Sequence, residues 1–268
     1  MRSGPVIEDR LELEAYLRRI GLSTAPTADL AGLAVLHEAH CATIPFENLD
    51  ILLGRPIALD LTSLQAKLVA CRRGGYCFEH NTLFAAVLEA LGFSITRLAA
   101  RVRSNTTEVR PRTHMLLRVD LPEGAFVADV GFGGEGCVLP VSLETQGDAT
   151  SHRVVREGGE SRVMQAHLTG AWTDLYAFTL EPQHAVDYEM ANHFTSTHAR
   201  SPFVLNLTAQ RAQRHRRSIL RNRDLVVHEG ERVRTSTVRD ADHLLEVLAA
   251  EFDLFFGAET RFAKPDFR

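Results

Sequence analysis

Residues 72–81 read Arg72-Arg73-Gly74-Gly75-Tyr76-Cys77-Phe78-Glu79-His80-Asn81, and this segment decides how the rest of the chain is interpreted. Gly74 and Gly75 allow a tight turn and let the backbone approach another part of the chain closely. Cys77 then falls in the first turn of an expected helix, where unpaired N–H groups and the positive end of the helix dipole favour a thiolate. Because a thiolate is the nucleophilic form, the segment predicts a reactive cysteine, although a buried structural cysteine fits the same position.

The chain on both sides of this cysteine carries helical periodicity from residue 9 to residue 92. Apolar residues recur at spacings of three and four, and glycines stand where the patterns stop. Cys77 begins the last of these patterns and Gly92 ends it. We therefore expect helices over residues 11–20, from just after residue 27 onward, over 61–71 and over 77–91.

After Gly92 the apolar period changes to two, which is typical of β-strands. Turn residues at 122–124 and 157–160 separate the apolar runs. We expect strands over residues 93–102, 115–121, 125–130 and 175–180, and a hairpin within 153–168. This middle region favours a small antiparallel sheet or barrel.

The carboxy-terminal part mixes both periods. Residues 187–200 fit a helix or an irregular segment, an amphipathic helix is expected over 243–256, and strands are expected over 203–207, 218–220, 225–228 and 233–238. The sequence thus predicts an α+β fold in three parts: a helical part over 1–92, a sheet over 93–186 and a smaller α/β part over 187–268.

Composition limits the class of protein. The 268 residues are 45% hydrophobic and 24% charged, which is typical of a globular chain and argues against a disordered or membrane protein. Four cysteines are too few for a disulfide-stapled scaffold, and the formal net charge of −4 predicts no nucleic-acid partner. Residues 1–9 show no apolar leader, and no apolar run approaches the roughly 18–20 residues that span a bilayer. We expect a cytoplasmic protein with no membrane partner.

A cysteine nucleophile needs a base and a group that orients the base. His114 opens the strand pattern before the turn at 122–124, and Asp129 closes the pattern after it. Because the two lie at similar distances from the turn, a hairpin makes them candidates for cross-strand neighbours. A half-buried strand histidine and a turn-capping aspartate would explain each residue singly, but together with Cys77 they predict a Cys-His-Asp site.

A metal site is the rival use of the histidines. His37, His40 and Cys41 have ligand-like spacing, and Cys77 and His80 add two more donors. Structural zinc sites show cleaner paired spacing than this, so we predict no metal.

Several motifs, in order along the chain, resemble those of the arylamine N-acetyltransferases. Residues 73–81 are similar to the active-site segment of that family, and residues 44–50 are similar to its early helical motif. Residues 113–114 and 129–133 resemble the segments that carry its histidine and aspartate, and residues 196–203 resemble a later motif. The resemblance covers nearly the whole chain.

The resemblance implies a helical bundle, a central antiparallel β-barrel and a C-terminal α/β lid around a cysteine-protease-like Cys-His-Asp core. It implies acetyl transfer from acetyl-CoA to an aromatic amine or hydrazine, as in xenobiotic metabolism, by a ping-pong mechanism. Cys77 would carry the acetyl group, His114 would handle the proton and Asp129 would hold the imidazole. Matching positions imply an acceptor pocket of Phe46, Val102, Thr113, Phe132 and Phe203. Gly131, Gly133 and Gly134 would leave room for the pantetheine arm of coenzyme A near the thiol.

Two other functions use the same order of Cys, His and Asp. An ansamycin-type amide synthase of the same family would share these residues and differ in its pocket. A transglutaminase-like cysteine hydrolase or acyltransferase would form an acyl-cysteine without coenzyme A. A small-molecule acceptor is the expected partner in the favoured interpretation, and the sequence leaves a homodimer open. We also expect Glu47 and Arg73 to form a buried ion pair, since neither charge would be tolerated alone.

Overall fold

A computed structural model describes residues 10–104, 106, 108–144 and 151–267 of the chain. Residues 1–9, on which the expectation about a leader rested, lie outside the described residues. The helices of the first part match the predicted periodicity, except the short α3, where no helix was predicted. They are α1 (Leu13–Arg19), α2 (Leu30–Thr43), α3 (Leu49–Leu52), α4 (Leu61–Leu64) with a π-helical continuation (Gln65–Ala70), and α5 (Cys77–Ala90).

Aspartate side chains cap the first turns of α2 and α4. Asp29 accepts a hydrogen bond from the Gly32 N–H at the start of α2, and Asp60 accepts one from the Ser63 N–H at the start of α4. Within the described residues, every helix is too short or too polar to cross a bilayer.

A seven-stranded antiparallel sheet forms the middle of the molecule, as the change of period predicts. Its order is β5-β4-β3-β2-β8-β7-β6, and its two edge strands come close to each other, so the sheet is nearly closed like a barrel. The predicted hairpin within 153–168 is confirmed, with β6 and β7 on either side of its turn. The strands are β2 (Ser94–Val102), β3 (Arg112–Leu121), β4 (Gly124–Ala128), β5 (Val141–Ser142), β6 (His152–Arg156), β7 (Arg162–Leu168) and β8 (Ala171–Phe178).

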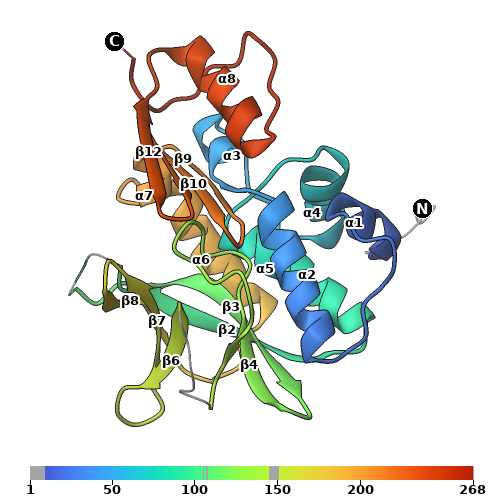
Figure 1. Ribbon diagram of the computed structural model, residues 1–268. Coiled ribbons are helices and arrows are strands. Elements are labelled where there is room, and N and C mark those ends of the chain that lie inside the picture. The colour runs from blue at the N-terminus through green and yellow to red at the C-terminus, as the bar shows by residue number, and fades with distance from the viewer. Residues whose placement is uncertain (1–9, 105, 107, 145–150, 268) are drawn as a thin grey trace, which may run out of the picture.

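A second, five-stranded antiparallel sheet lies above the first in Figure 1 and carries α8 (Ala241–Phe252). Its first strand comes from far away in the sequence, because Phe46 pairs with Gln210. The helical part and the carboxy-terminal part therefore share one sheet. Its strands are β1 (Phe46–Glu47), β9 (Thr208–Ala212), β10 (Arg216–Arg221), β11 (Asp224–Glu229) and β12 (Arg232–Thr237).

The prediction of a strand over 203–207 is wrong. Residues Pro202–Leu205 form the short helix α7, and the missed strand β9 follows it. Ser201 caps α7 by accepting from the Phe203 N–H, and Pro202 occupies the first turn, where its missing N–H costs nothing. Residues 187–200, left open between helix and irregular structure, belong to α6 (Ala185–Thr197) over most of their length.

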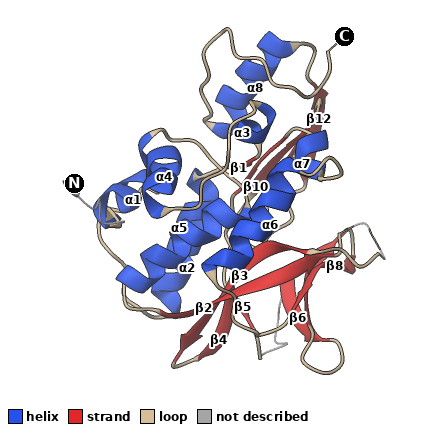
Figure 2. Cartoon of the chain, turned by 180° about the vertical axis from the view of Figure 1, so that it is seen from behind, coloured by secondary structure: helices blue, strands red, loops and turns tan. Residues whose placement is uncertain are grey.

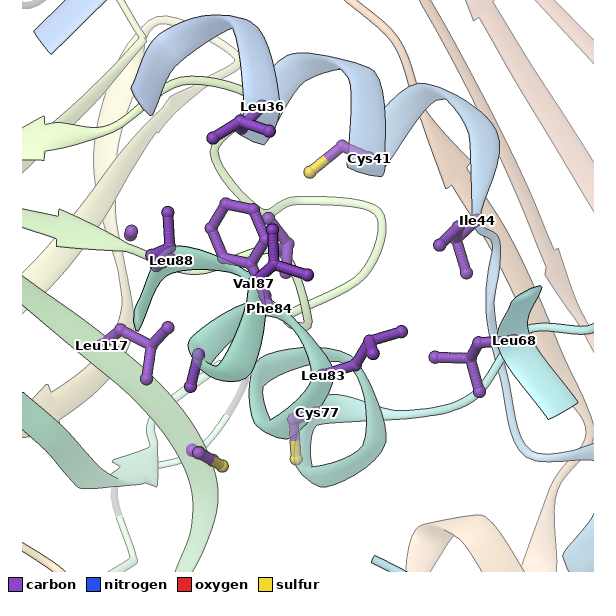
Figure 3. Close-up of a cluster of buried hydrophobic side chains, with 14 of the residues drawn as sticks. Leu36, Cys41, Ile44, Leu68, Cys77, Leu83, Phe84, Val87, Leu88 and Leu117 are labelled. Atoms are coloured by element: carbon purple, nitrogen blue, oxygen red, sulfur yellow. The ribbon is translucent and has the colours of Figure 1, made fainter. Parts of the chain in front are cut away.

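Helix α5 lies at the centre of the arrangement, between the other helices and the seven-stranded sheet (Figures 1 and 2). It packs against β2 and β3 on one side, and the rings of His37 and His40 on α2 meet its Phe84 on another. Figure 3 shows Cys77 on the first turn of this helix, pointing away from Leu36 and Cys41 on α2. The fold thus places the candidate nucleophile where the parts of the chain meet.

Candidate active site

The turn before Cys77 requires glycine because neighbouring atoms fill the space that a side chain would take. A Cβ on Gly74 would lie 1.9 Å from the Pro45 carbonyl oxygen, and a Cβ on Gly75 would lie 2.6 Å from Glu79 Oε2. The expected close backbone approach is therefore confirmed. It brings the 44–47 segment against the residues that lead into α5.

A buried network of charges surrounds this turn. The predicted pair is present, with Arg73 Nη2 2.7 Å from Glu47 Oε1, and Arg73 also meets Asp50 at 3.2 Å. Lys67 Nζ lies 2.8 Å from Asp50 Oδ2 and 2.7 Å from Glu79 Oε1. Because each charge has an opposite partner, the network holds the start of α5 without leaving an isolated buried ion.

Strand β3 brings His114 towards Cys77 through a β-bulge. Ala100 pairs with His114 and Arg101 pairs with Arg112, so Thr113 has no partner on β2. The Thr113 carbonyl oxygen then lies 3.6 Å from Cys77 Sγ. Bulges of this kind bend a strand and re-aim its side chains, and they are common beside active sites.

His114 and Asp129 form a close buried pair. His114 Nε2 lies 2.7 Å from Asp129 Oδ2, and the two side chains are 3% and 1% exposed. The register of β3 and β4 pairs Leu117 with Ala128, so Asp129 stands diagonally to His114 and not directly opposite it. The prediction that these two side chains meet is confirmed. The prediction that they are direct cross-strand partners differs from the observed register by two residues.

The other oxygen of Asp129 is also held. Oδ1 accepts from Asn81 Nδ2 at 3.0 Å and from the Gly131 N–H at 3.0 Å. Asn81 in turn donates to the Met115 carbonyl at 2.8 Å and accepts from the Val130 N–H at 3.2 Å. The carboxylate therefore has one orientation, fixed by α5 and by the turn after β4. The turn-capping role of Asp129 and its pairing with His114 occur together.

The electrostatics of the pair favour a charged imidazole. Burial acts to lower the pKa of His114, but the Asp129 carboxylate and the hydrogen bonds of the ring to Asp129 and Cys77 outweigh it and raise that pKa. Burial acts to raise the pKa of Asp129, and the interactions with His114, Asn81 and Gly131 lower it overall. Since Nε2 is taken by Asp129, Nδ1 is left for the Cys77 sulfur.

The five expected pocket residues fall into two groups. Phe132 packs on His114 with ring centroids 5.1 Å apart, Thr113 precedes His114, and Val102 pairs with Tyr176 at the adjacent strand ends. Phe46 and Phe203 form the second group, with ring centroids 5.9 Å apart.

A narrow cavity joins these groups. It has space for about one water molecule and is bordered by Phe46, Phe132, Gly133 and Gln210. The described side chains therefore leave little open volume between the two groups.

The glycines expected along the path of coenzyme A are each explained by the protein itself. A Cβ on Gly131 would lie 2.8 Å from the Cα of Cys77, a Cβ on Gly133 would meet Gln210 Oε1 at 2.6 Å, and one on Gly134 would meet Ile219. Gln210 accepts from the Gly134 N–H, and Arg217 donates to the Gly134 and Gly136 carbonyls. This loop is thus held by the five-stranded sheet.

The histidines weighed as metal ligands have other partners. His37 Nε2 accepts from the Asp129 N–H at 3.0 Å, and His40 and His80 bond to each other at 2.8 Å. Over the described residues, no three His, Cys, Asp or Glu side chains gather as a metal site would require. Sequence reasoning missed His37 as a support for Asp129, and no signal in the sequence identifies it.

Sequence reasoning also missed Asn81, Gln210 and Arg217 as supports of the site. Asn81 lies four residues after Cys77 on a helix, and this spacing places both on one face. That signal was available. Gln210 lies on β9, which pairs with the 44–47 segment, and Arg217 lies on β10, which pairs with β9. The first pairing is a long-range contact, and local patterns do not show it.

Known proteins of one family match this arrangement. A family model described as "N-acetyltransferase" matches residues 29–260. The arylamine N-acetyltransferase of Mycolicibacterium smegmatis is 39% identical over 257 residues, which cover 92% of this chain and 93% of that protein. The arylamine N-acetyltransferase / N-hydroxyarylamine O-acetyltransferase of Salmonella typhimurium is 35% identical over 90% of this chain and 88% of its own length.

Solved structures agree. The arylamine N-acetyltransferase of Nocardia farcinica superposes with a TM-score of 0.86 at 39% identity and covers 92% of this chain and 91% of its own. The Mycobacterium marinum enzyme in complex with CoA superposes with a TM-score of 0.83 at 35% identity, covering 90% and 92% of the two chains.

Proposed function

Because the chain belongs to the arylamine N-acetyltransferase family, and is thus an acyltransferase, we propose that it moves an acetyl group from acetyl-CoA to an aromatic amine or hydrazine through an acetyl-cysteine at Cys77. The single observation that carries this proposal is the Cys77, His114 and Asp129 arrangement. A buried carboxylate fixes an imidazole 2.7 Å away, and the free side of that imidazole faces the thiol. A thiol and an imidazole placed in this way exchange a proton to give a thiolate and an imidazolium.

In the first half-reaction the Cys77 thiolate attacks the thioester carbonyl of acetyl-CoA, and a carbon–sulfur bond forms to the enzyme. The tetrahedral oxyanion lies at the start of α5, where the Cys77 N–H is available as a donor. Collapse breaks the bond to the CoA sulfur, and the His114 imidazolium gives its proton to that leaving thiolate. Free CoA and a neutral imidazole result.

In the second half-reaction the acceptor amine attacks the acetyl-cysteine carbonyl. The neutral His114 takes the proton that the amine loses, and the Cys77 thiolate leaves. Asp129 keeps Nε2 of the ring protonated and stabilises the imidazolium that forms in each cycle. The acetylated amine departs, and the thiolate–imidazolium pair is restored.

The placement of the substrates is part of the same proposal. Phe46, Val102, Thr113, Phe132 and Phe203 would contact the acceptor, and the loop with Gly131, Gly133 and Gly134 would border the pantetheine arm. The family member that has CoA in its structure supports coenzyme A as the donor group. We also retain segments 1–92, 93–186 and 187–268 as the three lobes, of which the first supplies Cys77 and the second His114 and Asp129.

Mass spectrometry of the intact protein tests the proposal. Mixing with acetyl-CoA alone should add one acetyl group, and peptide mapping should place it on Cys77. The adduct should disappear when 5-aminosalicylate or a hydrazine is added, with the acetylated product released. Cys77→Ser should fold and show no adduct, while Cys71→Ser is the matched control on an exposed cysteine. A wild-type chain that releases no CoA and gains no acetyl group would overturn the proposal.

A further inference from the structure

A chain of hydrogen bonds that the proposed mechanism does not use runs through the core to the turn before Cys77. Tyr16 Oη lies 2.8 Å from His40 Nδ1, and His40 Nε2 lies 2.8 Å from His80 Nδ1. His80 Nε2 then lies 3.0 Å from the Gly75 carbonyl oxygen and 3.2 Å from that of Pro45. The side chains of Tyr16, His40 and His80 are fully buried and come from α1, α2 and α5. We refer to these three side chains as the histidine relay.

The carbonyl end of the relay fixes where its protons lie. Carbonyl oxygens only accept, so Nε2 of His80 must carry a proton and donate it. Nδ1 of a neutral His80 is then an acceptor, which assigns the proton between the rings to Nε2 of His40. Nδ1 of His40 accepts in turn, and the Tyr16 hydroxyl donates. Every donor in the relay therefore points towards the turn that leads to Cys77.

Burial supports the neutral form of both rings. Desolvation lowers the pKa of His80 to about 4, and it lowers the pKa of His40 well below the ordinary value, with His80 and His37 adding to the effect. A second proton on Nδ1 of His80 would also place two donors face to face between the rings. The relay is thus a set of neutral hydrogen bonds with one direction.

The relay ends on the peptide that joins Gly75 to Tyr76, and Tyr76 is the residue before Cys77. The carbonyl of the Gly75–Tyr76 peptide accepts from His80 Nε2 and from the Glu47 N–H at 2.7 Å. The N–H of the same peptide donates to Glu79 Oε2 at 3.0 Å. The unit is therefore pinned at both ends, and two of its three partners come from α5 itself.

The next backbone N–H along the chain is that of Cys77. Cys77 is the first residue of α5, so no carbonyl of an earlier helical turn is available to its N–H. None of the described residues accepts a hydrogen bond from this N–H. The peptide that carries this N–H is joined to the pinned Gly75–Tyr76 peptide through the Cα of Tyr76, so a shift of the pinned peptide would change the direction of the Cys77 N–H. In the proposed function this N–H receives the oxyanion of the acyl-transfer step.

We propose that His80, supported by His40 and Tyr16, is a positioning residue that aims the Cys77 N–H at the oxyanion. This inference rests on the proposed acyl transfer through Cys77. It predicts that the loss of His80 affects two reactions of the Cys77 sulfur to different extents. Acyl transfer needs both the thiolate and the oxyanion donor, whereas alkylation by iodoacetamide needs the thiolate and forms no oxyanion.

The experiment compares both reactions in the full chain. Acetylation of Cys77 is followed by rapid quench and mass spectrometry with acetyl-CoA and, separately, with p-nitrophenyl acetate. Alkylation is followed with iodoacetamide. In His80→Leu we expect acetylation to slow roughly 10- to 100-fold, which is the effect of a misplaced catalytic group, while alkylation changes by less than about threefold. His80→Gln keeps an amide donor for the two carbonyls and should restore most of the acetylation rate.

Two more variants complete the design. Tyr16→Phe removes only the far donor of the relay and should slow acetylation severalfold with alkylation unchanged. His193→Gln, on the exposed side of α6, is the matched histidine control and should behave as wild type. Thermal unfolding of each variant identifies any loss of fold, and Tyr16→Phe and His80→Gln keep the comparison available if His80→Leu does not fold.

The inference is overturned if acetylation and alkylation fall together in His80→Leu, because the sulfur itself would then be affected. It is equally overturned if acetylation is unchanged in both His80→Leu and Tyr16→Phe. A wild-type chain that is acetylated by p-nitrophenyl acetate and not by acetyl-CoA would contradict the proposed donor instead. The ester would still show whether His80 matters for the oxyanion.

Discussion

Four histidines of the described segments are buried, and they divide into two kinds. His37 and His40 lie on α2 and His80 lies on α5, and burial lowers the pKa of all three. His114 on β3 is 3% exposed, and its pKa is raised. Burial is nearly the same for all four, so burial does not decide the charge.

His114 and His37 both meet Asp129, and they differ in which part of that residue the ring contacts. His114 meets the carboxylate, whereas His37 accepts from the backbone N–H of the same residue. An opposite charge within hydrogen-bond distance outweighs desolvation, and a neutral N–H does not. One aspartate therefore supports a cationic histidine with its side chain and a neutral histidine with its backbone.

The largest effect is expected from Asp129→Asn, which removes the negative charge that raises the pKa of His114. The new amide would keep its oxygen towards Asn81 and Gly131 and present its NH2 group to Nε2 of His114. That ring nitrogen would become an acceptor, and the proton would move to Nδ1, the side that faces Cys77. We expect the rate of Cys77 acetylation to fall about 10⁴-fold, as when a triad aspartate is replaced by its amide. Rapid-quench mass spectrometry measures it.

Alkylation by iodoacetamide should fall in Asp129→Asn as well, because the thiolate itself depends on the charged imidazole. This distinguishes the aspartate from His80, whose loss should spare alkylation. Asp120→Asn is the matched control, since Asp120 lies on the same strand as His114 and pairs with Arg118 at 2.6 Å. A wild-type alkylation rate in Asp129→Asn would show that the carboxylate does not maintain the thiolate.

The sequence was sufficient to predict that His114 pairs with Asp129 beside Cys77. A cysteine after two glycines, an acid inside an apolar strand and a histidine across a turn are local signals, and the contact of His114 with Asp129 confirms the step between them. The order of helices and the switch to strands follow from periodicity for the same reason, since each pattern lies within about 15 residues of the chain.

The contacts of the three neutral histidines were not predictable from the sequence. His37 and His40 have the spacing of metal ligands, and nothing local shows that one meets a backbone N–H 92 residues away or that the other meets His80. The strand predicted over 203–207 failed because the Ser201 cap and Pro202 outweigh the apolar run after them. Long-range partners and caps decide such cases, and periodicity carries no information about either.

A moderate effect is expected on stability at acid pH, from the neutral histidines. The folded-state pKa is about 4 for His37 and His80, below the ordinary value of 6.5 for an unfolded chain. Between those values the unfolded chain binds more protons at these two positions, so the contribution of His37 and His80 to the free energy of unfolding should fall as the pH drops from 6.5 to 4. Urea unfolding at a series of pH values measures this slope.

His114 gives the opposite sign. Its folded-state pKa is raised, so its contribution to stability is complete below pH 6.5 and is lost as the pH rises through the folded-state value. His80→Gln should flatten the acid slope and leave the alkaline one unchanged, while His114→Gln should do the reverse. Identical pH profiles for the two variants would show that His80 and His114 do not differ in charge.

The smallest effect is expected from His37→Leu, which tests the two contacts of Asp129 against each other. The Asp129 N–H would lose its buried acceptor at a cost of about 1–3 kcal/mol in the free energy of unfolding, and His37→Gln, which keeps an acceptor, should recover part of it. The carboxylate would still be held by His114, Asn81 and the Gly131 N–H, so Cys77 acetylation should stay within about threefold of wild type. Urea unfolding and rapid-quench acetylation on the same samples separate the two effects. A loss of acetylation as large as that of Asp129→Asn would mean that the backbone contact with His37, and not the side-chain contacts, sets the direction in which the carboxylate faces His114.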